Sequence, residues 1–195
     1  MNLVSRAYEL KQRAERQEQT RQRIIEAAIE LHQNLGPART TVTDIADRAG
    51  VSRLTVYRHF PDELALGMAC SGLYWELHPL PDPEAWRSSP TLAGRLRAAL
   101  NQTYAYHRQT EPMMRHALAD SADTPIMQPY HEHWRHAAAV VAQAGPLGDP
   151  ENLMLRAAVG HALAFGTWQS LTHGQELTDQ EAIELMLRLV PDAES

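Results

Sequence analysis

The chain of 195 residues contains a single cysteine, Cys70, which excludes an internal disulfide and fits a reducing cytosol. No apolar run approaches the roughly 20 residues that span a bilayer, and the first residues lack the apolar segment of a secretory signal. We therefore expect a cytoplasmic protein without a membrane partner. Glycine-rich phosphate loops, nucleophile elbows and paired-carboxylate motifs are also missing, so we expect neither an enzyme nor a bound metal or other cofactor.

Positive charge is scarce overall but is concentrated at one end of the chain. The net charge is −6, yet residues 1–60 carry ten Lys/Arg and seven Asp/Glu, a net charge of +3. Residues 61–195 carry eight Lys/Arg and seventeen Asp/Glu, a net charge of −9. A basic head on an acidic body suits a protein that contacts phosphate with one end only.

No stretch alternates with the period of two that is typical of strands, whereas apolar residues recur at helical spacing along the chain. The four prolines of residues 78–90 predict a loop, and Glu111-Pro112 predicts a break between two helices. We expect an all-α fold with helices over residues 24–35, 62–77, 92–109, 112–119, 124–144, 150–172 and 178–190, and with two short helices within residues 41–60.

Residues 41–60, TVTDIADRAGVSRLTVYRHF, predict two short helices joined by a tight turn. Thr43 is placed to cap the first helix, and Gly50 follows its last residue, where a left-handed backbone favours glycine. Ser52 is placed to cap the second helix, whose buried side carries Val56. The other side chains of the second helix point outward with two arginines and no acid among them. Such a face suits the major groove of DNA.

The stretch AGVSRLTVYRHFPDELAL, residues 49–66, resembles the DNA-binding motif of the TetR family of transcriptional regulators. The matching pattern covers about a quarter of the chain, residues 20–66. The resemblance implies a three-helix helix-turn-helix headpiece followed by a helical ligand-binding and dimerisation body. We accordingly expect an N-terminal extension over residues 1–19, a DNA-binding domain over 20–62 and a body over 63–195.

The resemblance also implies that a homodimer binds a palindromic double-stranded DNA operator. The side chains expected at the DNA are Thr43, Tyr57 and His59 on phosphates, Ser52 at the helix cap, and Arg53, Leu54, Thr55 and Arg58 on base edges. One position departs from the family pattern. Glu63 stands where a lysine often meets a phosphate, and its carboxylate should weaken DNA binding.

A self-association surface is expected on the last two long helices, which in the family form a four-helix bundle with those of the partner. Small residues on one helix permit a close approach, and the other helix carries an apolar stripe. The candidates are Ala157, Gly160, His161, Ala164 and Trp168 on the first helix, and Ile183, Met186, Leu187 and Val190 on the last. The alternative is that both stripes form the core of a single chain.

An effector pocket is expected among the helices of the body, because methionine and aromatic side chains make adaptable apolar walls. Its candidate lining is Trp75, Tyr104, His107, Met113, Met114, Met127, Trp134, Phe165 and Trp168. Residues of these types at helical spacing also serve as plain core. An apolar or aromatic small molecule is the expected ligand.

The run His131-Glu132-His133-Trp134-Arg135-His136 suggests a second class of function, a metal-dependent enzyme or a metal sensor. It is not the zincin pattern, which places two histidines four residues apart, and the arginine inside it opposes a cation. A solvated helix face is the favoured interpretation.

Residues 1–19 mix arginines with glutamates and predict either a frayed helical extension or a disordered arm. This segment is either a solvated tail or an arm that contacts DNA phosphates or the minor groove. Taken together, the sequence predicts a DNA-binding regulator, a repressor released by a small molecule. A DNA-binding dimer without an effector is the other alternative.

Overall fold

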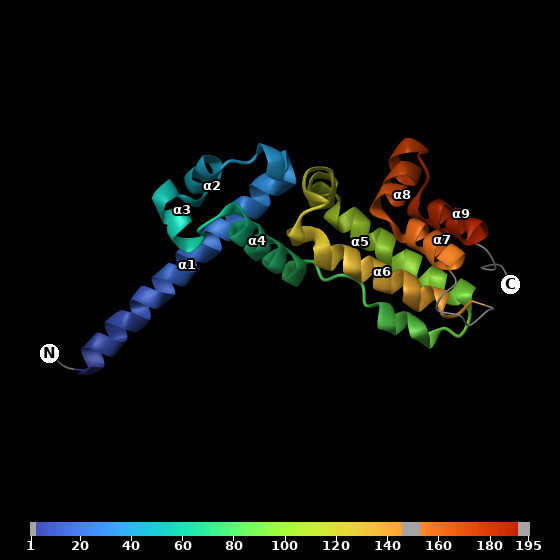
Figure 1. The fold of residues 1–195 in the computed structure, drawn as a ribbon, viewed down its shortest axis with the longest axis horizontal. Helices are drawn as coiled ribbons and strands as arrows, with labels where there is room; N and C mark the ends of the chain where they lie inside the picture. Colours follow the sequence, from blue (N-terminus) through green and yellow to red (C-terminus); the bar gives the residue numbers. More distant parts are fainter. Residues whose placement is uncertain (1–2, 146–152, 191–195) are drawn as a thin grey trace. The chain divides into compact units, whose positions relative to one another are not determined.

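The computed structural model describes residues 3–145 and 153–190, and the regular structure within these ranges is helical throughout (Figure 1). The contacts divide the chain into two compact units. The first comprises residues 1–78 together with 115–126, and the second comprises residues 79–114 together with 127–195. The all-α prediction, with an N-terminal headpiece and a helical body, is confirmed.

The first unit is built around α1, a helix of 33 residues that contacts both α2 and α4. No glycine or proline interrupts residues 3–35, so the N-terminal extension and the first headpiece helix form one continuous helix. Its buried side chains begin with Ile24 and Ile25. The elements of this unit are α1 (Leu3–Leu35), η1 (Pro37–Arg39), α2 (Val42–Ala49), α3 (Arg53–His59), α4 (Glu63–Leu77) and the last residues of α5.

The second unit is a set of helices around an aromatic core that includes Trp86, Tyr104 and Trp168. α6 contacts both α7 and η2. The elements are η2 (Pro83–Ser88), α5 (Leu92–Ser121) as far as Met114, the last residue of η3 (Pro125–Met127), α6 (Gln128–Ala142), α7 (Leu153–Leu163), α8 (Phe165–Gln169), the π-helical turn η4 (Ser170–Gly174) and α9 (Asp179–Leu189).

The sequence predictions for α5 and for the segment before it are wrong. α5 continues through Pro112, although proline removes a backbone donor and disfavours a helix interior. Buried side chains on both sides of the proline, among them His107 and Met114, hold the helix in place. The predicted loop of residues 78–90 contains η2, because Pro83 supplies the first position of a short helix that Asp82 caps.

The helix predicted over residues 150–172 begins outside the described residues, and its described part is divided at Ala164, whose backbone is extended. The break leaves the last carbonyl groups of α7 without helical partners. Two side chains of α5 satisfy them: the Tyr104 hydroxyl donates to the Ala162 carbonyl at 3.1 Å, and His107 Nε2 lies 2.9 Å from the Leu163 carbonyl. Long-range hydrogen bonds of this kind leave no periodic signal in the sequence.

Gly36 occupies the turn after α1 and approaches the last residues of α5, which belong to the same unit. Its φ is +90°, and a Cβ built on it would lie 2.7 Å from Asp120 Oδ2. That carboxylate accepts a hydrogen bond from the Ala38 amide at 3.0 Å. Glycine is therefore required here both by the backbone conformation and by the close approach.

We expect Gly36→Ala to lower the free energy of unfolding by about 1–2 kcal/mol or more. The positive φ strains the backbone of any residue with a Cβ, and the added methyl would also collide with Asp120. Urea unfolding followed by circular dichroism measures the change. Gly72→Ala is the matched control, because Gly72 lies within α4 with no atom within 4 Å of the added methyl. That control should gain roughly 0.5–1 kcal/mol. Equal effects of the two substitutions would contradict the close approach at Gly36.

Candidate functional site

The first helix of the predicted helix-turn-helix, α2, is capped by Thr41 rather than by Thr43. Asp44 N donates to Thr41 Oγ1 at 3.2 Å, and Thr41 N donates to Asp44 Oδ2 at 2.9 Å, which makes a reciprocal capping box. The Thr41 hydroxyl also donates to Asp44 Oδ2 at 2.6 Å, and this hydrogen bond, followed by that from the Thr41 amide, lowers the pKa of the Asp44 carboxyl. The spacing Thr-x-x-Asp was the available sequence signal for this cap. Thr43 lies exposed in the first turn of α2.

The turn between α2 and α3 has the predicted geometry. Gly50 adopts a left-handed conformation with φ +66°, and Val51 N donates to the Ala46 carbonyl at 3.0 Å. Ser52 caps α3, because its Oγ accepts a hydrogen bond from Thr55 N at 3.2 Å. Local hydrogen bonds therefore satisfy backbone groups at the end of α2 and at the start of α3. These bonds hold the turn between the two helices in one conformation.

One face of α3 is buried and the opposite face is open to solvent. Val56 and Phe60 are buried, whereas the side chain of Leu54 is 76% exposed and that of Tyr57 is 44% exposed. Arg53 and Arg58 are also exposed, and Thr55 and His59 are half-buried. The outward face predicted for DNA contact is therefore present on α3.

The helix-turn-helix and α4 are both anchored to α1. The Arg21 guanidinium lies 5.2 Å from the centre of the Phe60 ring, and Arg48 of α2 forms an ion pair with Glu30 of α1. Cys70 of α4 is buried against α1, and burial raises the pKa of its thiol to about 12. The thiol is therefore a protonated core group.

In the second unit, five of the residues predicted to line an effector pocket gather in one place. His107 is fully buried, with the rings of Phe165 and Trp134 each centred 5.4 Å away. The Trp168 ring lies 5.9 Å from it and the Tyr104 ring 6.4 Å. We call these five residues the aromatic cluster. Four more candidates are placed elsewhere: Met113, Met114 and Met127 are buried in the second unit, and Trp75 belongs to α4 of the first.

The imidazole of His107 is held in one tautomer. Nε2 donates to the Leu163 carbonyl, so Nδ1 of the neutral ring is an acceptor, and it is a buried atom without a hydrogen-bond partner. Burial lowers the pKa of His107 to about 4, while the Leu163 carbonyl and the Asp179 carboxylate act in the opposite direction. The aromatic cluster therefore contains a neutral base with an unused acceptor at pH 7.

An open groove of about 500 Å³ lies between α6 and α7 in the second unit. Its mainly apolar walls include the exposed Leu153 of α7 and reach Trp134 of the aromatic cluster. The full lining is His131, Trp134, Arg135, Ala138, Leu153, Arg156, Ala157 and Gly160.

The residues predicted for the dimer interface are divided between surface and core. Ala157 and His161 are exposed, and Gly160 and Ala164 are half-buried. The remaining five are buried within the single chain: Trp168, Ile183, Met186, Leu187 and Val190. The stripe of α9 therefore fills the core of this chain, as the alternative interpretation held. The exposed part of the predicted interface lies on α7, and the interface itself stays a prediction.

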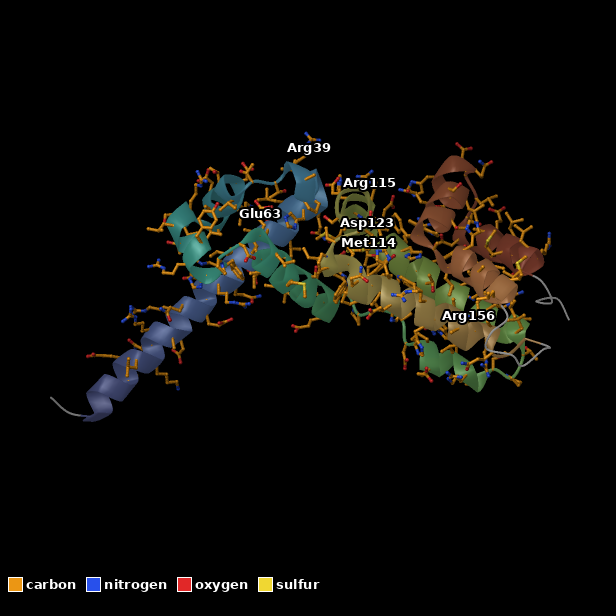
Figure 2. The ribbon with its side chains drawn as sticks, viewed as in Figure 1. Arg39, Glu63, Met114, Arg115, Asp123 and Arg156 are labelled. Atoms are coloured by element: carbon orange, nitrogen blue, oxygen red, sulfur yellow. The ribbon has the colours of Figure 1, made fainter. Side chains whose placement is uncertain are left out.

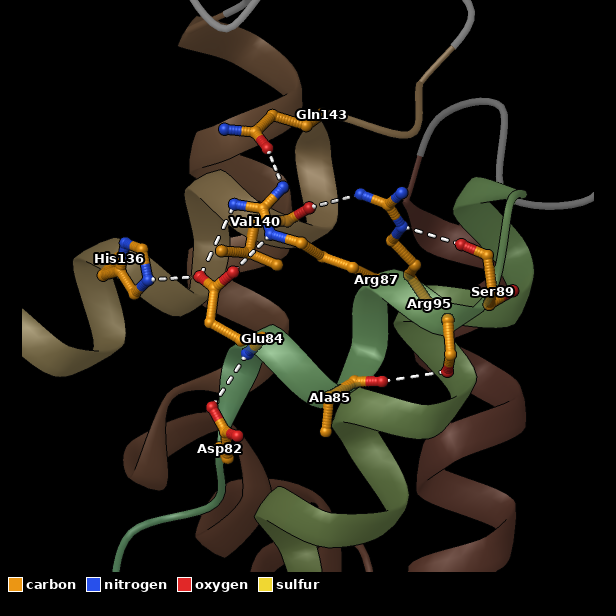
Figure 3. A network of polar contacts seen from close by, with 10 residues as sticks. Asp82, Glu84, Ala85, Arg87, Ser89, Arg95, His136, Val140 and Gln143 are labelled. Atoms are coloured by element: carbon orange, nitrogen blue, oxygen red, sulfur yellow. Dashed lines mark hydrogen bonds and ion pairs between the residues drawn. The ribbon is translucent and has the colours of Figure 1, made fainter.

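The histidines of residues 131–136 differ in their surroundings. His136 Nε2 lies 2.9 Å from Glu84 Oε1, and the same carboxylate accepts a hydrogen bond from Arg87 Nε at 2.5 Å (Figure 3). His133 is half-buried, and burial lowers its pKa. Within the described ranges, no group of three His, Cys, Asp or Glu side chains is arranged to hold a metal ion. Nor does any helix in these ranges combine the length and apolarity needed to cross a membrane.

Comparison with known proteins gives matches over the headpiece and over most of the chain. Residues 24–75 match the family model described as bacterial regulatory proteins, tetR family. The HTH-type transcriptional regulator TtgR of Pseudomonas putida is 42% identical over 64 residues, 33% of this chain and 30% of the relative. The chain thus spans less than a third of that relative. The HTH-type transcriptional regulator SrpR of Pseudomonas putida is 31% identical over 156 residues, 73% of this chain and 70% of the relative.

Two solved structures share the fold. The crystal structure of HlyIIR, a hemolysin II transcriptional regulator, has a TM-score of 0.64 at 18% identity, covering 90% of this chain and 99% of that one. The multidrug binding protein EbrR, solved in complex with imidazole, has a TM-score of 0.55 at 22% identity, covering 88% and 89%.

Proposed function

This chain belongs to the TetR family of bacterial transcriptional regulators, and we propose that it is a dimeric repressor released from a palindromic operator by a small molecule. The observation that carries the proposal is the outward face of α3, presented by a helix-turn-helix whose two helices are both capped. A helix held in this way can enter the major groove, with Arg53, Leu54, Thr55 and Arg58 at base edges. Thr43, Tyr57 and His59 would hold phosphates. Its place of action is the cytoplasm, where the operator lies.

The exposed apolar face of α7 supports the homodimer. Leu153 and Met154 are 74% and 82% exposed, and Ala157 and His161 follow at helical spacing. Large exposed apolar side chains on one helix mark a surface that a partner covers. A twofold dimer through this face would present two copies of α3 to two half-sites about 34–36 Å apart, or a multiple of that distance.

The aromatic cluster supports an effector site in the body. A neutral aromatic molecule with one hydrogen-bond donor would match the ring walls and the unused acceptor at His107 Nδ1. EbrR is complexed with imidazole in its crystal structure, so a protein of this fold can hold a small ring. An effector that favours the conformation unable to bind the operator would weaken DNA binding, and operator DNA would weaken effector binding by the same factor.

Two substitutions on α3 test the proposal. Arg53→Ala should relax specificity at one base position, because a bidentate arginine–guanine contact carries roughly 1–3 kcal/mol of discrimination. Tyr57→Phe should weaken binding to all sequences about equally, because a phosphate contact carries no sequence information. Binding to a set of operator variants, selected first from random DNA, separates these outcomes. A uniform loss of affinity in both variants would refute the division of roles, and wild-type protein without sequence preference would refute the function.

Glu63→Lys should tighten DNA binding and steepen its salt dependence. Glu63 is exposed in the first turn of α4, and a lysine there could meet a phosphate (Figure 2). One added phosphate contact changes the slope of log K against log salt by roughly −0.9. Glu76→Lys is the matched control, because it makes the same charge change near the other end of α4. If the two variants shift the slope equally, Glu63 does not face the DNA backbone.

A further inference from the structure

The N-terminal half of α1 has a surface that the headpiece core does not use. We call residues 8–20 the arm. Nearly all of its side chains are exposed, whereas buried positions on α1 begin at Ile24. The arm belongs to the same helix as the headpiece core, so its direction relative to α3 is fixed by α1 within the first unit (Figure 1).

A groove of about 710 Å³ lies between α1 and α3, and its lining carries more positive than negative charge. The lining contains three arginines of α1 and one arginine of α3, against a single carboxylate, that of Glu18. The full lining is Arg13, Ala14, Arg16, Gln17, Glu18, Thr20, Arg21, Thr55, Arg58 and His59.

The positive charge of this groove is only partly neutralised within the chain. Glu18 Oε1 lies 3.7 Å from Arg21 Nη1, so these two side chains form an ion pair and neutralise each other's charge. The Arg21 guanidinium also stacks on the Phe60 ring. Arg13 and Arg16 form no ion pair with the described side chains, although the neighbouring Lys11 pairs with Glu15 at 3.9 Å. Two uncompensated guanidinium groups therefore lie on the wall opposite α3.

We propose that this groove binds the sugar-phosphate backbone of the DNA that flanks the half-site read by α3, with Arg13 and Arg16 as the phosphate ligands. The inference rests on the proposed function, because α3 supplies the other wall of the groove. Duplex DNA carries one negative charge per roughly 1.7 Å of its axis, so the strand beside α3 continues past the base contacts as an unbroken row of phosphates. Guanidinium groups bind phosphate oxygens in bidentate geometry.

An isolated helix of the arm's length is marginal in water, because helices shorter than about 12–15 residues gain too few hydrogen bonds to offset nucleation. The arm is stabilised at one end by the buried part of α1, and phosphate contacts would stabilise it along its length. The operator would accordingly extend beyond the bases that α3 reads, without adding sequence preference there.

The test compares two double variants that each remove two positive charges from α1. Arg13→Gln with Arg16→Gln removes the proposed phosphate ligands. Lys11→Gln with Arg23→Gln changes the net charge equally at exposed positions of the same helix that do not line the groove. Each protein is titrated with the selected operator over a range of salt concentrations. Two duplexes are used, one with about 10 bp, or one helical turn, of flanking DNA on each side and one ending at the half-sites.

On the long duplex, the slope of log K against log salt should be less steep for the variant lacking Arg13 and Arg16. The slope should change by roughly 0.9 for each lost phosphate contact, or about 1.8 per protomer. Its affinity at 0.1 M salt should fall by roughly tenfold for each counterion no longer released. On the short duplex it should match the wild type. The Lys11 and Arg23 variant should keep the wild-type slope on both duplexes, and all three proteins should have the same melting temperature.

Equal losses in the two double variants would show a general effect of net charge and would overturn the proposal. Unchanged slopes in both would overturn it as well. These outcomes differ from a failure of the proposed function, in which the wild-type protein itself shows no preference for the selected operator.

Discussion

Replacing Asp179 with alanine is expected to lower the free energy of unfolding by about 2–3 kcal/mol, because it leaves two donors of the body without their acceptor. Asp179 Oδ2 accepts a hydrogen bond from Arg108 Nε at 2.8 Å, and Oδ1 accepts one from Arg108 Nη2 at 2.6 Å. Oδ1 also accepts a hydrogen bond from Trp168 Nε1 at 2.9 Å. Trp168 is fully buried, so its indole N–H cannot turn to water when the carboxylate is removed.

The position of Asp179 adds to the effect. It is the first residue of α9, where a negative charge is favoured by the helix dipole, and it joins α9 to both α5 and α8. Hydrogen bonds from Arg108, followed by that from Trp168, lower the pKa of its carboxyl, which keeps it charged at neutral pH. Asp179→Asn should lose less stability than Asp179→Ala, because the amide oxygen can still accept from Trp168.

Glu184→Ala is the matched control for Asp179. Glu184 also joins α9 to α5, through an ion pair with Arg97, but both of these side chains are substantially exposed. An exposed ion pair contributes about 0–1 kcal/mol. Urea unfolding of the three variants measures the difference. If Glu184→Ala destabilises the protein as much as Asp179→Ala, the buried hydrogen bond of Trp168 is not what makes Asp179 important.

The headpiece could be predicted in detail because its determinants are local in sequence. A capping residue and its amide partner lie three positions apart, as for Ser52 and Thr55, and a left-handed turn needs one glycine, Gly50. The cap predicted at Thr43 was misplaced by two residues, and the reciprocal hydrogen bonds of Thr41 with Asp44 identify Thr41 as the cap. The outward face of α3 follows from helical periodicity alone.

The body was predicted less well because its determinants are long-range. The division of the helix at Ala164 depends on α5 supplying Tyr104 and His107 as partners for released carbonyls, across 58 and 56 residues of sequence. Helical spacing identified the apolar stripe of α9 containing Ile183 and Met186, but spacing cannot tell a core stripe from an interface stripe. Only the burial of these side chains within one chain decides between the two.

Acidification from pH 6.5 to pH 4 is expected to destabilise the protein through His107. Burial lowers the pKa of this histidine from 6.5 to about 4, so the unfolded chain takes up a proton in this range that the folded chain does not. The stability contributed by the neutral ring is present above pH 6.5 and is lost as the pH falls toward the folded pKa. At about 1.4 kcal/mol per pKa unit, the loss attributable to His107 reaches roughly 3 kcal/mol.

The comparison that isolates His107 is wild-type protein against His107→Gln, unfolded by urea at a series of pH values from 7.5 to about 4. Glutamine can donate to the Leu163 carbonyl and does not titrate, so the variant should lose less stability on acidification even if it is less stable at pH 7. Part of the pH dependence should remain in the variant, because burial also lowers the pKa values of His32 and His133. Parallel stability curves for the two proteins across this range would mean that His107 is not held neutral by burial, and the acceptor proposed for the effector would lose its basis.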